Sequence, residues 1–181
     1  MTSTATGAME AVTYPEGFQR VAAALASLGH DNAPVWLEAS ARTSQEAADA
    51  LGVAVGQIAK SVIFRRVSND ANDDAAVLVV TSGDRRVDER RVAAIVCAEG
   101  GKLARADAEF VKARTGFSIG GVAPLAHRAP VLTLIDRDLF RFGEIWAAAG
   151  HPNGVFQLTP ADLVRLTGGA PVADVVQVPA A

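Results

Sequence analysis

Apolar residues at helical spacing predict two helices in the first third of the chain. The first is expected over residues 15–29, and its apolar face is made by Phe18, Val21, Ala22, Leu25 and Leu28. The second is expected over residues 44–52, because Thr43-Ser44-Gln45-Glu46 is a capping-box pattern. Its buried stripe is expected at Ala47, Ala48 and Leu51.

Three further helices are predicted in the second half of the chain. One begins at about Asp88 and turns three apolar residues inward, namely Val92, Ile95 and Val96. Another is capped by Asp107 and stopped by Gly116. The last opens at Thr159-Pro160, with threonine as the N-cap and proline in the first turn, and ends at Gly168-Gly169.

Short apolar runs predict the strands of a sheet. Residues 57–64 and 75–81 are separated by the polar segment 67–74, so we expect them to form a β-hairpin. The second run is apolar on both faces, which is typical of a central strand covered on both sides. Further strands are expected at residues 35–37, 102–105, 131–135, 144–149, 155–158 and 172–178.

The order of these elements indicates the fold class. Short helices and strands alternate irregularly, without the regular βαβ rhythm of a doubly wound sheet, so we expect a mixed α/β (α+β) fold. No linker and no internal repeat divides the chain. Residues 1–13, rich in Ser, Thr, Ala and Gly, are predicted to be a mobile tail, and residues 14–181 a single domain.

Composition narrows the class of protein. The chain has 181 residues, of which 50% are hydrophobic and 20% charged, as in ordinary globular domains. With 17 Lys and Arg against 20 Asp and Glu, the net charge of −3 excludes a nucleic-acid binder that relies on bulk positive charge. Cys97 is the one cysteine, which fits a cytoplasmic protein, and residues 1–17 have no signal-peptide pattern.

Lys60 is the first candidate for a chemical role. It interrupts an apolar strand, in which alternation places residues 58, 60, 62 and 64 on one face and residues 59, 61 and 63 on the other. Burying an unpaired ammonium is costly, so the side chain must reach solvent, find a partner or await an anionic ligand. A strand-end lysine that reaches solvent is the plain alternative, and the pattern alone leaves both open.

Two glycine-containing segments are candidate parts of a binding site. In residues 117–127, Gly120-Gly121 is followed three residues later by Pro124. Glycines let a ligand approach the backbone, and unpaired amides there can donate to an oxyanion or a carbonyl. The turn of residues 149–154 contains His151 as a candidate pocket residue. An ordinary turn is the plain alternative for each segment.

Other chemistry is poorly supported by the sequence. The densest basic cluster, which is either a solvated helix start or a phosphate-contacting patch, is Arg85, Arg86, Arg90 and Arg91. No P-loop, G-x-G-x-x-G or G-x-S-x-G motif is present. The spacing of Ser118, His127 and Asp136 does not indicate a catalytic Ser-His-Asp triad. The three histidines are too scattered for a metal site, so we expect neither metal nor cofactor.

Taken together, several segments resemble the YbaK/prolyl-tRNA-synthetase-associated domain family, the free-standing relatives of the editing domain inserted in bacterial prolyl-tRNA synthetases. These segments are residues 56–64, 120–124, 134–136, 149–150 and 158–163. The resemblance runs from about residue 18 to residue 177 in the family's order, and the lysine followed by a distant Gly-Gly-x-x-Pro loop is its most specific part. It implies a single compact domain around a mixed, largely antiparallel, barrel-like sheet with flanking short helices.

The resemblance also implies site residues. Lys60 matches the family's essential lysine, and it is expected to hold the anionic 3′ end of a tRNA. Gly120 and Gly121 are expected to polarise an ester carbonyl, which makes these three the expected catalytic residues. The expected substrate-binding residues are Arg42, Thr43, Ser61, Pro124, Gly150 and His151. The expected contacts to tRNA phosphates are Arg85, Arg86, Arg90 and Arg91.

The implied reaction is hydrolysis of the ester that joins a wrong amino acid to the 3′-terminal adenosine of a tRNA. No protein nucleophile is visible, so water is the expected attacker. The expected partners are aminoacyl-tRNA and prolyl-tRNA synthetase or another synthetase, in the cytoplasm and away from membranes. Two alternatives stay open: a non-catalytic module that binds tRNA ends or a synthetase, and a hydrolase of small esters or thioesters. The sequence does not say whether Ala, Cys, Ser or Thr is removed.

Overall fold

The strands form one mixed sheet. In a computed structural model, which describes residues 12–70 and 73–179, eight strands pair in the order β1-β7-β6-β2-β3-β5-β8, with β4 also paired to β2. The tail predicted over residues 1–13 lies outside the described residues, apart from its last two. The strands are β1 (Val35–Trp36), β2 (Ile58–Val67), β3 (Ala75–Ser82), β4 (Lys102–Arg105), β5 (Val131–Asp136), β6 (Ile145–Ala148), β7 (Gly154–Leu158) and β8 (Val172–Ala173).

Both strand directions occur in the sheet. Strand pairs β1–β7, β6–β7, β2–β3 and β2–β4 are antiparallel, whereas β2–β6, β3–β5 and β5–β8 are parallel. The two end strands, β1 and β8, do not pair with each other within the described residues, so the sheet is not a closed barrel. The expected mixed α/β fold with a largely antiparallel sheet is confirmed.

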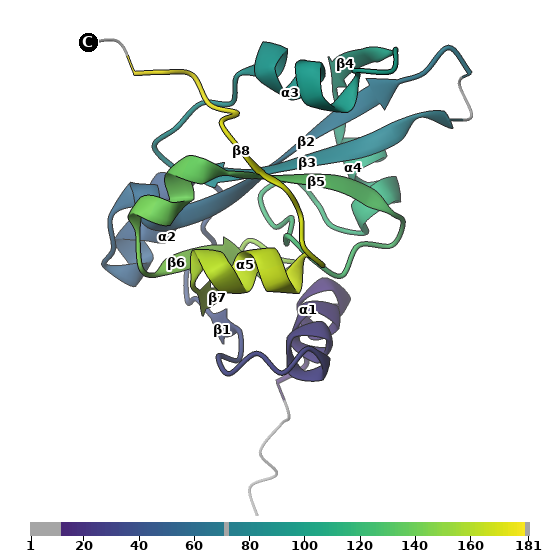
Figure 1. Cartoon of the computed structure of the whole chain (residues 1–181). Helices are drawn as coiled ribbons and strands as arrows, with labels where there is room; N and C mark the ends of the chain where they lie inside the picture. Colours follow the sequence, from purple (N-terminus) through teal and green to yellow (C-terminus); the bar gives the residue numbers. More distant parts are fainter. Residues whose placement is uncertain (1–11, 71–72, 180–181) are drawn as a thin grey trace, which may run out of the picture.

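The β2–β3 hairpin is the centre of this sheet (Figure 1). Its register places Lys60 opposite Thr81. β3 lies between β2 and β5, and the side chains of residues 76–80 are completely buried. This confirms the central strand expected from a run that is apolar on both faces.

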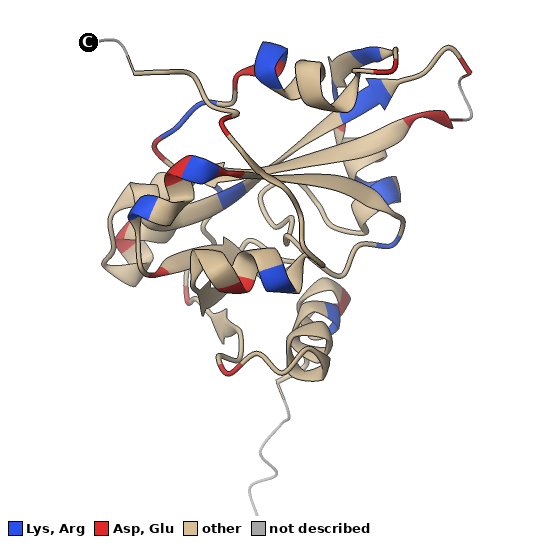
Figure 2. Ribbon diagram, viewed as in Figure 1, with Lys and Arg blue, Asp and Glu red and all other residues tan. Residues whose placement is uncertain are grey.

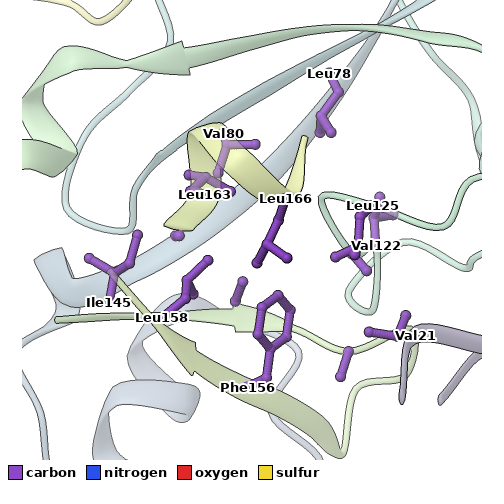
Figure 3. Close-up of a cluster of buried hydrophobic side chains, with 14 of the residues drawn as sticks. Val21, Leu78, Val80, Val122, Leu125, Ile145, Phe156, Leu158, Leu163 and Leu166 are labelled. Atoms are coloured by element: carbon purple, nitrogen blue, oxygen red, sulfur yellow. The ribbon is translucent and has the colours of Figure 1, made fainter. Parts of the chain in front are cut away.

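Helices cover the two faces of the hairpin. They are α1 (Glu16–Ser27), α2 (Ser44–Leu51), α3 (Glu89–Val96), α4 (Ala108–Thr115) and α5 (Pro160–Leu166), with the short 3-10 helices η1 (Val55–Gln57) and η3 (Arg137–Arg141). Helices α1 and α5 pack on the face that carries Leu78 and Val80, and Figure 3 shows this larger core. Helix α3 packs on the opposite face, against Val77 and Val79. Among the described helices, none combines the length and apolar character needed to span a bilayer.

The predicted N-caps are formed. The Thr43 hydroxyl accepts from the Glu46 amide at 3.2 Å, and the Glu46 carboxylate accepts from the Thr43 amide at 3.1 Å. Asp107 and Thr159 cap α4 and α5 in the same way, through the amides of Phe110 and Asp162. These bonds satisfy amides that a helix start leaves without partners.

Three details of the prediction are wrong. Leu28 is 45% exposed, because α1 ends at Ser27 and the chain turns away before Leu28 can pack. Ile95 is 46% exposed, because the short α3 turns Val92 and Val96 inward and leaves Ile95 beside them. The strand predicted over residues 172–178 pairs only at Val172–Ala173, followed by a single bridge between Val176 and Val87.

Candidate active site

A cavity of about 320 Å³ lies beside the start of β2. Its walls come from residues 41–47, residues 58–61, the loop at 119–122, and residues 146–155 of β6, β7 and the turn between them. Most lining side chains are small or apolar, and no Asp, Glu or Cys lies among the described residues that line the cavity. The charged and polar ones are Arg42, Thr43, Ser44, Lys60, Ser61 and His151. The cavity therefore brings together most of the expected catalytic and substrate-binding residues.

The ammonium of Lys60 is held by backbone carbonyls. Nζ donates to the carbonyl oxygen of Arg85 at 2.5 Å and to that of Gly83 at 3.4 Å. Burial lowers the pKa of Lys60, and the charge of Asp84 acts in the opposite direction. Within the described residues no carboxylate forms an ion pair with Nζ, so the positive charge is oriented but not neutralised. Such a charge suits an anionic ligand.

Ion pairs and close packing brace the turn that supplies these carbonyls. Arg85 Nε lies 2.5 Å from Asp138 Oδ2, and Arg141 Nη2 lies 2.6 Å from Asp84 Oδ1. A Cβ on Gly83 would lie 2.4 Å from the Val55 carbonyl oxygen, so η1 packs directly against the turn. The two acceptors of the lysine are therefore fixed by contacts on both sides.

The three loops around the cavity touch one another. A Cβ on Gly121 would lie 2.8 Å from the backbone of His151, so the Gly-Gly loop packs against the turn of residues 149–154. That turn is tied to the segment before α2, because the Ala41 amide donates to the Pro152 carbonyl at 2.8 Å. Gly120 lies against Arg42, whose carbonyl oxygen would be 3.8 Å from a Cβ on this glycine. Segments far apart in the sequence thus form one rim.

The two adjacent glycines differ in their surroundings. The Gly121 amide donates to the Ser118 carbonyl at 3.0 Å, within a turn, and Gly121 does not line the cavity. Gly120 lines the cavity and has a φ of +92°, which favours glycine. Its amide has no hydrogen-bond partner within the described residues. Of the two amides, that of Gly120 is therefore the one available to a ligand.

Two other expected residues lie behind the cavity wall. Gly150 packs against α1, where a Cβ would lie only 2.4 Å from the Gly17 carbonyl oxygen. Pro124 is buried, and neither residue lines the cavity. At these positions they shape the loops that form the cavity wall, and their predicted contact with substrate stays a prediction.

Ser61 and His151 supply polar groups to the cavity. The Ser61 hydroxyl is buried and has no hydrogen-bond partner within the described residues, which marks it as available to a ligand. The His151 Nδ1 accepts from the Asn153 amide at 3.1 Å, so the neutral ring carries its proton on Nε2. Burial lowers the pKa of His151, and the ring stacks on Trp36 with centroids 4.8 Å apart. At neutral pH this imidazole is an uncharged donor.

The predicted arginine cluster divides into two kinds of residue. Arg85 is ion-paired with Asp138, and Arg91 lies 3.5 Å from the Asp88 carboxylate. Arg86 and Arg90 are exposed. Figure 2 shows Lys and Arg distributed over many elements and interleaved with Asp and Glu. The four arginines therefore differ in how far carboxylates already occupy them, and their predicted contacts with tRNA phosphates stay a prediction.

Sequence reasoning missed several parts of the site. Ser44 and Trp146 line the cavity, and the first of these was within reach because it follows the capping threonine directly. The ion pairs that link Asp138 and Arg141 to the turn after β3 could not be predicted from local sequence, because the partners are more than 50 residues apart. Among the described residues no group of three His, Cys, Asp or Glu side chains is placed to hold a metal ion.

The fold and the cavity define a single α/β domain with a pocket built around a lysine. Residues 38–166 match the family model of the aminoacyl-tRNA editing domain. The chain is 34% identical over 128 residues to the uncharacterized protein YwhH of Bacillus subtilis (strain 168), covering 70% of this chain and 75% of YwhH. The chain therefore belongs to the aminoacyl-tRNA editing domain family, which confirms the resemblance seen in the sequence.

Solved structures share this fold over nearly the whole chain. A candidate trans-editing enzyme for prolyl-tRNA synthetase is 40% identical, with a TM-score of 0.81 and coverage of 92% of this chain and 100% of that one. The hypothetical protein APE2540 is 26% identical, with a TM-score of 0.76 and coverage of 87% and 99%.

Proposed function

We propose that the protein is a trans-editing aminoacyl-tRNA deacylase, which hydrolyses the ester joining a wrong amino acid to the 3′-terminal adenosine of a tRNA. The observation that carries the proposal is the Lys60 ammonium, held by two carbonyls in the wall of a cavity whose lining side chains are mostly small or apolar. Membership of the editing family supports it. The charge suits the anionic tRNA end, and the cavity suits a small amino acid.

In this proposal the chain positions an ester that is already activated. Lys60 binds phosphate or ribose oxygens of the tRNA end, and the Gly120 amide donates to the ester carbonyl. Gly121 acts through packing, because its own amide is already engaged. Water adds to the carbonyl carbon, and the carbon–oxygen bond to the ribose then breaks. The products are the free amino acid and a tRNA with its 3′-terminal hydroxyl restored.

The remaining cavity residues are proposed to select the amino acid. Arg42 and Thr43 lie on one side of the cavity and His151 on the other, where its Nε2 proton can be donated. Ser61 adds a buried hydroxyl without a partner in the described part of the chain. Because the similar solved protein is named as a candidate trans-editing enzyme for prolyl-tRNA synthetase, mischarged proline tRNA is the proposed substrate and that synthetase a proposed partner. Charged tRNA is used in the cytoplasm, which is the proposed location.

Deacylation of a panel of mischarged tRNAs tests the proposal. Wild type is expected to release at least one amino acid, and Lys60→Met to slow this release by roughly 100-fold, because it removes the charge but keeps a long side chain. Lys102→Met is the matched control, since this lysine is exposed on β4 and does not line the cavity. The proposal fails if no tRNA in the panel is deacylated, or if Lys60→Met is as active as wild type.

The deacylation assay separates the two alternatives when tRNA binding and the cleavage of free aminoacyl esters are measured alongside it. A non-catalytic module would bind the tRNA end stoichiometrically without releasing the amino acid. A hydrolase of small esters would cleave free aminoacyl esters as fast as aminoacyl-tRNA, since the tRNA would then contribute little binding energy.

A further inference from the structure

Part of one edge of β2 is unpaired within the described residues. On this edge β6 pairs with Ile58–Ala59 and β4 pairs with Phe64–Val67, and no described strand covers Lys60–Ile63 between them. Figure 1 shows β6 and β4 toward opposite ends of β2. Along such an edge, alternate residues direct both their N–H and C=O groups outward. This stretch therefore offers backbone donors and acceptors beside the lysine.

A second hollow of about 330 Å³ lies along this stretch. Lys60 lines both this hollow and the cavity described above, so the two meet at its side chain. The apolar residues lining the second hollow are Val62, Ile63, Phe64, Val87 and Ala106. Its charged residues are Lys60, Arg86, Glu89 and Arg105. It thus combines an apolar surface with an excess of positive charge.

The two arginines of this hollow are available to a ligand. The Arg86 guanidinium is exposed and has no hydrogen bond or ion pair within the described residues. Arg105 is 82% exposed and lies 3.8 Å from Glu89, a surface pair that holds it weakly. In contrast, the neighbouring Arg85 is engaged by Asp138 at 2.5 Å. Arg86 is therefore an unpaired cation among the described residues, and Arg105 a weakly paired one, next to an apolar surface.

We propose that this second hollow binds the nucleotide that precedes the terminal adenosine of the tRNA, an inference that rests on the proposed function. The aminoacyl ester then lies in the first cavity, and the backbone crosses Lys60 toward Arg86 and Arg105. Guanidinium groups bind phosphates through paired hydrogen bonds, and a base packs on the apolar surface and on an arginine plane. Binding the single-stranded end of the tRNA in this way needs only a few cations, which agrees with a chain whose net charge is −3.

Binding of an uncharged proline tRNA tests the inference without requiring catalysis. Its affinity is compared with that of the same tRNA lacking its last three nucleotides, by fluorescence anisotropy. Wild type is expected to prefer the intact tRNA by about tenfold or more, and Arg86→Ala/Arg105→Ala to lose most of this preference. The double variant is also expected to reduce the slope of log affinity against log salt by about 0.7, since the one phosphate of a single-stranded nucleotide contributes about that much.

Arg137→Ala/Arg165→Ala is the charge-matched control. Both residues are exposed and line neither hollow; Arg137 pairs with Asp174, and Arg165 pairs with Asp162 in its own helix. This control is expected to keep the preference for the intact 3′ end. The inference is overturned if wild type binds intact and trimmed tRNA equally, or if the control loses the preference as fully as the test variant. Loss of the preference in the test variant, together with an inactive wild type in the deacylation panel, would support this hollow and reject the proposed hydrolysis.

Discussion

The turn that holds Lys60 is expected to be sensitive to a single methyl group. In Gly83→Ala the new Cβ would lie 2.4 Å from the Val55 carbonyl oxygen and 2.7 Å from the Ser44 Cβ. The turn must shift to relieve this overlap, which moves a carbonyl that accepts from the Lys60 ammonium. We expect the free energy of unfolding to fall by about 1–3 kcal/mol and deacylation to slow, as measured by urea unfolding and steady-state kinetics.

Gly143→Ala is the matched control for this substitution. No atom lies within 4 Å of a Cβ built on Gly143, and its φ is not in the left-handed region. The control is expected to change the free energy of unfolding by no more than about 0.5 kcal/mol and to leave the rate unchanged. Equal effects of the two substitutions would show that packing at Gly83 does not position the lysine.

Lys60 could be identified from the sequence because a charge in an apolar strand requires an explanation. Its hydrogen-bond acceptors could not be identified in the same way. The carbonyls of Gly83 and Arg85 are common to every residue type, and their position depends on ion pairs with Asp138. Likewise, the difference between Gly120 and Gly121 depends on which amide the turn uses.

Helices α2 and α5 have the same N-cap chemistry in different surroundings. Thr43 and Thr159 each accept from the amide three residues later, but only Thr43 lines the cavity. Each Thr→Ala substitution is expected to lower the free energy of unfolding by about 1 kcal/mol. Of the two variants, only Thr43→Ala is expected to raise KM for the mischarged tRNA, because the start of α2 forms part of the cavity wall. A similar rise of KM in Thr159→Ala would count against this assignment, and chemical unfolding with steady-state kinetics provides both measurements.

Local patterns were sufficient for the helices but not for the order of the strands. The capping residues Thr43, Asp107 and Thr159 act within one turn of chain, so they can be read directly. The parallel pairing of β2 with β6 joins residues 58–59 to residues 146–147, and no local signal reports such a distant partner. The gap that this pairing leaves along β2 was therefore also invisible in the sequence.

The stability of the whole chain is expected to fall as the pH is lowered from about 7 toward 5. Burial lowers the pKa of both His127 and His151 in the folded protein. The unfolded chain binds protons near pH 6.5, where these folded-state imidazoles resist them, so protonation favours unfolding. Urea unfolding at several pH values measures this fall.

His127→Gln isolates one of these contributions. The His127 Nε2 bonds to the Ala123 carbonyl at 2.8 Å, and a glutamine amide can donate to the same oxygen without titrating. The variant is expected to lose less stability than wild type between pH 7 and 5. Asp136 acts in the opposite direction, because burial raises its pKa, so the comparison between variant and wild type is the decisive one. Identical slopes would mean that His127 does not contribute.

The cavity around Lys60 can be completed only late in the synthesis of the chain, because its walls come from distant segments. Residues 41–61 supply one side, and residues 146–155 the other, so roughly a hundred residues must be translated between them. At ribosomal speeds of about 5–20 residues per second, this interval lasts roughly 5–20 seconds. Until the interval ends, the nascent chain lacks one wall of the pocket. Under the proposed function, we therefore expect the growing polypeptide to be unable to cleave the charged tRNAs that deliver its own amino acids.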